Sequence, residues 1–197
     1  MPPEIRKSLL LLHKGHLQMM PRNRLMIRQG LPYPTILFDW GDTVMRDDPA
    51  SSVPMVEWPA VEVVPGIADV LAYLHSSGRR IILATSASIS DESQIWGALK
   101  RGGLADYFSY IYCFKNTGLP KGEEFYRHIL SDLGIPASQA LMVGDGFEKD
   151  VQAANAVGLF AVWFNWRSDE TRKGDLHVTV HSMQELLAFF SALDRKE

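Results

Sequence analysis

The stretch Thr35-Ile-Leu-Phe-Asp39-Trp-Gly-Asp-Thr43 decides the predicted fold, because an apolar run ends in it on a carboxylate. Short apolar runs bounded by turn residues are typical of buried strands, so Asp39 is expected at the edge of a sheet. A second such run, residues 140–143, is followed by Asp145 and Asp150. Carboxylates that follow two buried strands indicate a site that handles a metal ion or a phosphate group.

Apolar, β-rich runs alternate with segments of helical period from residue 34 onward. This alternation predicts βαβ units and a doubly wound, Rossmann-like α/β fold, in which a parallel sheet carries helices on both faces. Strands are expected at residues 36–38, 81–84, 110–114, 140–143, 160–164 and 178–180. Helices are expected over 65–78, 91–101, 123–133 and 183–193, with another that ends at 156. Residues 115–122 are expected to form a loop, and the proline-punctuated residues 44–64 a loop or small hairpin over the sheet edge.

The composition is that of an ordinary soluble globular domain, with 46% hydrophobic and 22% charged residues. A single domain is expected over residues 34–197. The net charge of −3 gives no reason to expect a nucleic-acid partner. The lone Cys113 excludes an internal disulfide framework and is compatible with the reducing cytoplasm, where we expect the protein. No apolar run approaches the roughly 18 to 20 residues that span a bilayer, so no membrane span is expected.

The first 33 residues form a basic extension, in which six Lys and Arg residues stand against the single acid Glu4. One interpretation is a basic amphipathic helix from about Glu4 to Met20, ended by Pro21, that acts at a membrane surface or in targeting. The other is that these residues are an appended tail, or a false upstream start of the chain, that the chemistry does not need. Met26 would then be an alternative first residue. We favour the second interpretation.

Polar side chains also follow two further predicted strands. Thr85 comes directly after residues 81–84, and Lys121 lies in the loop beyond residues 110–114. Ligands of open α/β sheets bind beyond the carboxyl ends of the strands, near a topological switch point. Each residue alone has a plain structural explanation, since Asp and Thr commonly cap helices. Only their combination with Asp39 and Asp145 indicates a functional site.

Taken in order, four motifs resemble those of the haloacid dehalogenase superfamily of aspartate-nucleophile phosphohydrolases, over residues 34 to about 190. The first is Ile36-Leu-Phe-Asp39-Trp-Gly-Asp-Thr43 and the second is Ile81-Ile-Leu-Ala-Thr85-Ser. The third is Lys121, in Lys-Gly-Glu-Glu where many relatives have Lys-Pro-Asp-Pro. The fourth is Leu141-Met-Val-Gly144-Asp145-Gly-Phe-Glu-Lys-Asp150.

The resemblance implies a Mg²⁺-dependent phosphomonoester hydrolase, in which Asp39 attacks phosphorus and forms an aspartyl-phosphate. Phosphate would be bound by Thr85, Ser86 and Lys121, assisted by the backbone N–H groups of Ser86 and Ala87. The metal would be held by oxygen atoms. The expected set comprises the carboxylates of Asp39 and Asp145, the backbone carbonyl of Gly41, and Asp150, which acts through bound water.

One position departs from the family pattern. Relatives carry a second Asp two residues after the nucleophile, which protonates the leaving group and activates water. Here that position is Gly41, and Asp42 comes one residue later. Acid–base catalysis contributes about 10² to 10⁴-fold, so the substitution matters. Asp42 is the candidate to replace the missing group, although adjacent side chains in a turn usually diverge and capping of the turn is its other interpretation.

The spacing of the motifs leaves no room for a folded cap domain, since Thr85 comes 46 positions after Asp39 and Lys121 comes 36 positions after Thr85. The site is expected to be open apart from the 44–64 loop. Its entrance side chains would be Met45, Arg46, Met55 and Trp58. Lids normally exclude water, so an open site suggests a large phosphorylated substrate or a partner subunit as lid, and an oligomer is compatible with the sequence.

Three rival functions use the same residues. A catalytically weak phosphate-binding or scaffold protein would explain Gly41. A phosphoacceptor signalling domain also uses Asp, Thr and Lys at strand ends, but its acidic metal ligands precede the phosphorylated Asp, whereas here Asp145 and Asp150 follow Asp39. Dehalogenation is disfavoured, because it needs no metal ligands.

Overall fold

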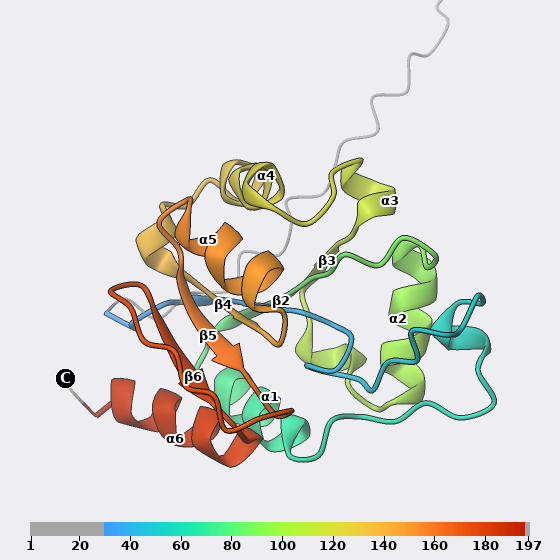
Figure 1. Cartoon of the computed structure of the whole chain (residues 1–197), viewed down its shortest axis with the longest axis horizontal. Helices are drawn as coiled ribbons and strands as arrows, with labels where there is room; N and C mark the ends of the chain where they lie inside the picture. The colour runs from blue at the N-terminus through green and yellow to red at the C-terminus, as the bar shows by residue number, and fades with distance from the viewer. Residues whose placement is uncertain (1–29, 196–197) are drawn as a thin grey trace, which may run out of the picture.

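Six parallel strands form the centre of the protein, whose computed structural model describes residues 30–195 (Figure 1). Their order across the sheet is β3-β2-β1-β4-β5-β6, and every neighbouring pair is parallel. The strands are β1 (Thr35–Phe38), β2 (Arg80–Ala84), β3 (Tyr110–Tyr112), β4 (Ala140–Gly144), β5 (Phe160–Phe164) and β6 (His177–Val180). The prediction of a doubly wound α/β fold is confirmed.

The order in which the chain adds strands to the sheet reverses between β1 and β4. The chain places β2 and β3 on one side of β1 and then returns to place β4 on the other side. In the register, Phe38 pairs with both Leu83 and Val143, so the three central strands end level with one another. The backbone N–H of Asp39 still donates to the carbonyl of Val143, at 2.9 Å. Residues that directly follow these strands therefore gather at one edge of the sheet, at the switch point where such folds bind ligands.

Helices cover both faces of the sheet (Figure 1). One core contains Ile36 and Phe38, with α1 (Ile67–Ser76), α2 (Glu92–Arg101) and α6 (Met183–Leu193) packed on it. The other contains Leu37, with α4 (Glu123–Leu133) and α5 (Ala153–Asn155). Because successive strand residues point to opposite faces, a strand that is buried on both reads as a continuous apolar run.

Local sequence signals set the ends of two helices. Asp91 accepts the backbone N–H of Gln94 at the start of α2, and the Gln94 side chain accepts the N–H of Asp91, which makes a capping box. At the C-terminal end of α4, Gly134 has a φ of 63°, the left-handed conformation that commonly ends a helix. The predicted helices over residues 123–133 and 183–193 agree with α4 and α6.

Two segments differ from their predicted structure, residues 113–117 and residues 147–152. The third strand ends at Tyr112 rather than 114, and a short helix, α3 (Phe114–Thr117), occupies part of the expected loop. The Asn116 side chain accepts the backbone N–H of Cys113 at 2.9 Å, so local capping overrides the strand preference there. After Asp145, the segment Phe147–Gln152 is π-helical before α5 begins, where a regular helix was expected.

Residues 44–64 form a hairpin-like loop, as predicted. Its stem is closed by hydrogen bonds from the N–H of Arg46 to the carbonyl of Glu62 and from the N–H of Val64 to that of Val44, at 2.9 and 3.0 Å. We call residues 47–61, beyond this stem, the flap; it contains the 3₁₀ turn Met55–Glu57. Arg101 of α2 donates to the carbonyls of three flap residues, Val56, Trp58 and Pro59. The flap is thus fixed on α2, and the described residues contain no larger insertion at this position.

The expected basic extension falls largely on residues 1–29, which lie outside the described part of the chain. Its helical interpretation over Glu4 to Met20 therefore stays a prediction. None of the helices formed by residues 30–195 is long and apolar enough to cross a membrane.

Candidate active site

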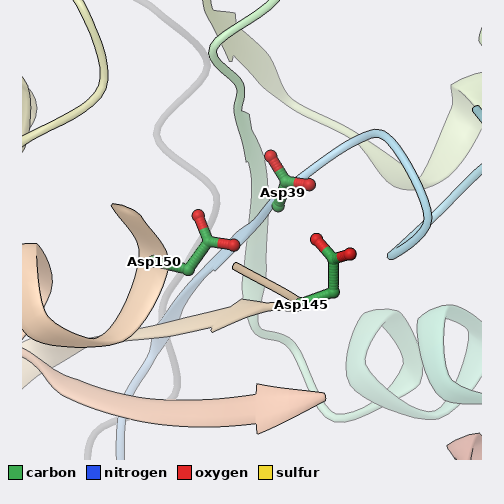
Figure 2. A group of neighbouring side chains, drawn as sticks. All are labelled: Asp39, Asp145 and Asp150. Carbon is green, nitrogen blue, oxygen red and sulfur yellow. The ribbon is translucent and has the colours of Figure 1, made fainter. Parts of the chain in front are cut away.

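Three carboxylates meet at the switch point of the sheet. Asp39 follows β1, Asp145 follows β4, and Asp150 lies in the π-helical segment. Each can offer an oxygen atom such that all these atoms lie within 4.8 Å of one another. Figure 2 shows the three side chains converging from their separate elements. This acidic triad can hold a metal ion.

Asp150 reaches the triad because its side chain folds back over the end of β4. Its Oδ2 accepts the backbone N–H of Gly146 at 2.8 Å. A Cβ atom at position 144 would lie only 2.2 Å from the same oxygen, so Gly144 is required for this approach. The Gly-Asp-Gly sequence therefore serves to bring Asp150 next to the strand end.

Lys121 is buried between two of the three carboxylates. Its Nζ lies 2.7 Å from Oδ1 of Asp39 and 2.5 Å from Oδ1 of Asp150. Burial by itself lowers the pKa of Lys121, but the two carboxylates overcome that effect and raise it above the usual value. Lys121 is therefore a permanent cation beside the carboxylate of Asp39.

Burial also acts on the acids. Together with the charge of Asp39 it raises the pKa of Asp150 to about 7, although the Lys121 charge opposes this effect. It likewise raises the pKa of Asp145, which an ion pair with Arg167 counteracts. Solvent therefore stabilises the negative charges of Asp145 and Asp150 poorly. An additional positive charge beside them would be stabilising.

Thr85 lies at the end of β2 with its side chain buried. Its Oγ1 accepts the backbone N–H of Ala87 at 3.1 Å, which leaves the hydroxyl hydrogen for another acceptor. The N–H of Ala87 is thus engaged by Thr85, rather than directed to a phosphate as expected from the sequence. Ser86 is exposed at the cavity wall.

A cavity of about 480 Å³ opens over these groups. It brings together every site residue proposed from the sequence, namely Asp39, Gly41, Asp42, Thr85, Ser86, Lys121, Asp145 and Asp150. Of the expected entrance residues, Met55 and Trp58 line it. Trp58 also anchors the flap, since its Nε1 donates to Oγ of Ser51 at 2.8 Å. Met45 is instead fully buried in the core.

Asp42 lies at the cavity wall with its backbone in the left-handed region, at φ of 55°. Its Oδ2 is 2.6 Å from Arg167, and its Oδ1 accepts the backbone N–H of Asp47 at 3.4 Å. The carboxylate is thus bound by an ion pair and by a contact that caps the turn.

Sequence reasoning missed four charged residues of the cavity, Arg167, Asp47, Asp48 and Lys149. Arg167 follows β5 and pairs with both Asp42 and Asp145, and it stacks on the exposed ring of Trp166 with 4.5 Å between the guanidinium carbon and the ring centroid. Its place after a strand end was the signal that could have found it. Asp47 is the first residue of the flap, and partial burial of its carboxyl raises its pKa.

The family model of haloacid dehalogenase-like hydrolases matches residues 41–158, which is more than half of the chain. The protein belongs to this family. The match begins just after Asp39 and includes the segments that carry Thr85, Lys121 and the Gly-Asp-Gly turn.

Curated members of the family give more detail. The chain is 30% identical over 134 residues to the enolase-phosphatase E1 of Marinobacter nauticus, covering 68% of this chain and 55% of that protein. It is also 30% identical over 161 residues to the ribulose-1,5-bisphosphate 5-phosphatase of Halopiger xanaduensis, covering 80% and 62%. The chain therefore spans less than two thirds of the length of these relatives.

Solved structures share the fold of this family member. An uncharacterised protein from Listeria monocytogenes superposes with a TM-score of 0.69 at 22% identity, covering 82% of this chain and 98% of its own. A haloacid dehalogenase-like family hydrolase from Xanthomonas campestris gives 0.65 at 16% identity, covering 85% and 98%. At these identities the likeness concerns the fold alone.

Proposed function

We propose that this protein is a phosphomonoester hydrolase that uses Asp39 as its nucleophile. The observation that carries the proposal is the buried contact of Lys121 with Asp39 inside a cavity that also contains Thr85 and two further carboxylates. Phosphoryl transfer needs mainly positioning and positive charge, because its transition state spreads charge over the phosphoryl oxygens. A nucleophile, a fixed cation and a hydroxyl donor at one sheet edge meet that need.

The chain's own groups divide the work as follows. An Asp39 oxygen attacks phosphorus, and the bond to the leaving group breaks. Lys121 holds the Asp39 carboxylate in place and offers its charge to the incoming phosphoryl group. Thr85 and Ser86 donate hydroxyl hydrogen bonds to phosphoryl oxygens. Water then releases phosphate from the aspartyl-phosphate and restores Asp39.

The residues at the site fit Mg²⁺. Its preferred ligands are oxygen atoms, of which the triad supplies three carboxylate sources and Gly41 a backbone carbonyl. The cavity contains more acidic than basic side chains near the triad, which disfavours entry of a phosphate dianion until a cation is added. When bound, Mg²⁺ would supply that charge and polarise the phosphoryl group. Asp39, Gly41 and Asp145 would hold it, with Asp150 acting through bound water.

Arg167 should compete with the metal for Asp145, with which it forms an ion pair. We expect Arg167→Gln to tighten Mg²⁺ binding by about 3- to 10-fold, because a positive charge beside the metal is removed. Calorimetric titration with Mg²⁺ measures this directly. Arg127→Gln, on the exposed face of α4 outside the cavity, removes the same charge and should leave the affinity unchanged. Equal or weaker binding by Arg167→Gln would show that the arginine does not oppose the metal.

The relatives and the cavity support one class of substrate. Two proteins similar to this one are named ribulose-1,5-bisphosphate 5-phosphatase and phosphoglycolate phosphatase, which supports a small phosphorylated molecule over a macromolecule. A cavity of about 480 Å³ has room for such a ligand. The cytoplasmic location stays a prediction from the single cysteine.

The test is hydrolysis of p-nitrophenyl phosphate and of a panel of phosphorylated metabolites, with Mg²⁺ and with EDTA. We expect turnover with Mg²⁺ and a loss of at least about 10²-fold with EDTA, because the acidic triad then lacks its cation. Phosphate release is measured continuously. Mg²⁺ binding without turnover on any phosphoester would contradict the proposal and favour the phosphate-binding scaffold instead.

A further inference from the structure

The carboxylate of Asp47 occupies the space into which a side chain at position 41 would extend. A Cβ atom built on Gly41 would lie 2.9 Å from Oδ2 of Asp47 and 3.2 Å from its Cγ. Gly41 does not have a positive φ, so its backbone would accept an ordinary side chain and only the space is taken. We propose that Asp47 is a catalytic residue that supplies the acid–base carboxylate missing from position 41. This inference rests on the proposed phosphatase function.

The chain path after β1 explains how Asp47 comes to this place. The left-handed turn at Asp42 reverses the backbone, and its N–H donates to the carbonyl of Met45 at 2.7 Å. The stem then pairs Arg46 with Glu62, so Asp47 is the first residue beyond the pairing. These hydrogen bonds hold the backbone that leads into Asp47, and the Asp47 side chain extends back over Gly41.

The orientation of the Asp47 carboxylate is fixed by one hydrogen bond. The backbone N–H of Asp48 donates to its Oδ1 at 3.0 Å. Its Oδ2 has no hydrogen-bond partner among residues 30–195, and the residue lines the same cavity as Asp39. One carboxylate oxygen is therefore available to a ligand beside the nucleophile.

The other two acids of this turn are placed differently. Asp42 pairs with Arg167 and receives the N–H of Asp47. Asp48 also lines the cavity, with its Oδ1 accepting the N–H of Ala50 at 3.0 Å, but the three atoms nearest to a Cβ at position 41 all belong to Asp47. The flap that carries Asp47 is held on α2 by the three hydrogen bonds from Arg101. A general acid must be held beside the reacting atoms, and Asp47 is the acid of this turn whose carboxylate lies against position 41.

The proton transfers balance over one turnover. As the Asp39 oxygen bonds to phosphorus and the ester P–O bond breaks, protonated Asp47 gives its proton to the leaving oxygen, which departs as an alcohol. The Asp47 carboxylate then takes a proton from water as that water attacks the aspartyl-phosphate. The P–O bond to Asp39 breaks, inorganic phosphate leaves, and Asp39 and protonated Asp47 are restored.

The decisive comparison uses two aryl phosphates of similar shape with Asp47→Asn. The phenolate of phenyl phosphate is a poor leaving group that needs protonation, whereas p-nitrophenolate leaves without it. We expect kcat/KM to fall by about 10²-fold or more for phenyl phosphate and by less than about tenfold for p-nitrophenyl phosphate. With the second substrate, aspartyl-phosphate should accumulate and give a burst of p-nitrophenolate, since its hydrolysis lacks a base.

The matched control is Glu57→Gln, which makes the same carboxylate-to-amide change on an exposed flap residue outside the cavity. It should behave as the wild-type protein with both substrates. Equal losses of Asp47→Asn on the two substrates would indicate a structural role and overturn the inference, as would full activity on phenyl phosphate.

A relocated carboxylate gives an independent test. Gly41→Asp alone should be impaired, because its side chain would meet Asp47, and Asp47→Gly alone should lose activity on phenyl phosphate. The double variant Gly41→Asp with Asp47→Gly should recover at least about tenfold over Asp47→Gly, because it restores a carboxylate in the same space. A folded double variant without recovery would contradict the inference. If the wild-type protein itself shows no turnover, the phosphatase proposal fails together with this one; an active wild type with insensitive Asp47 variants overturns this one alone.

Discussion

Replacing Asp39 by asparagine is expected to abolish hydrolysis, with a loss on the order of 10⁴-fold or more in kcat for p-nitrophenyl phosphate. The amide has the shape of the carboxylate but cannot attack phosphorus or form the acyl phosphate. Lys121 keeps its contact with Asp150 in this variant, so the fold should be retained. The measurement is steady-state hydrolysis in Mg²⁺, with thermal unfolding to confirm that the variant is folded.

Acid-quenched reactions with a phosphoester substrate that carries a labelled phosphoryl group test the same residue by a second route. Wild-type protein should yield a hydroxylamine-sensitive phosphopeptide that contains Asp39, and Asp39→Asn should yield none. Glu57→Gln should label and turn over as the wild type does, because it lies outside the cavity. Residual activity of Asp39→Asn above about one hundredth would point to another nucleophile. A long-lived phosphorylated Asp39 without phosphate release would instead favour the phosphoacceptor domain.

Residues at strand ends could be predicted from the sequence because the parallel fold decides where they lie. Once the apolar runs before Asp39, Thr85 and Asp145 are assigned as parallel strands, their carboxyl ends must meet at one edge of the sheet. Lys121 is less determined by this rule, because α3 and a turn separate it from its strand. Its motif position, rather than periodicity, indicated its place.

Residues whose positions depend on tertiary contacts could not be predicted in this way. The flap returns over Gly41 only because its stem pairs with residues near 62 and Arg101 holds it on α2, and no local pattern encodes those contacts. Asp47 therefore looked like one acid in a polar loop. The π-helical turn that carries Asp150 is likewise a local distortion that hydrophobic periodicity does not reveal.

The position of the flap changes how the missing carboxylate at position 41 is interpreted. From the sequence, Gly41 suggested either a weakened enzyme or a role for Asp42. In the structure, Gly41 is the residue that makes room for Asp47, since a larger side chain would collide with it. A small residue at one position and an acid at another thus form one spatial unit, although five residues lie between them.

Lys121→Met is expected to destabilise the metal-free protein by about 3 to 5 kcal/mol. The Lys121 side chain is only 1% exposed, and its removal leaves the carboxylates of Asp39 and Asp150 close together without a cation. Breaking a buried ion pair from one side costs this much because a charge remains buried and uncompensated. Urea unfolding in EDTA measures the change in the free energy of unfolding.

Two companion variants identify the cause of that destabilisation. Lys100→Met removes the same charge from an exposed position on α2 and should change the free energy of unfolding by less than about 0.5 kcal/mol. Adding Asp150→Asn to Lys121→Met removes one of the two stranded carboxylates and should recover part of the loss. Mg²⁺ should stabilise Lys121→Met more than it stabilises the wild type, because the metal replaces the missing cation in the folded state alone. A Lys121→Met protein as stable as the wild type in EDTA would mean that the lysine does not neutralise the site, and its catalytic assignment would lose its electrostatic basis.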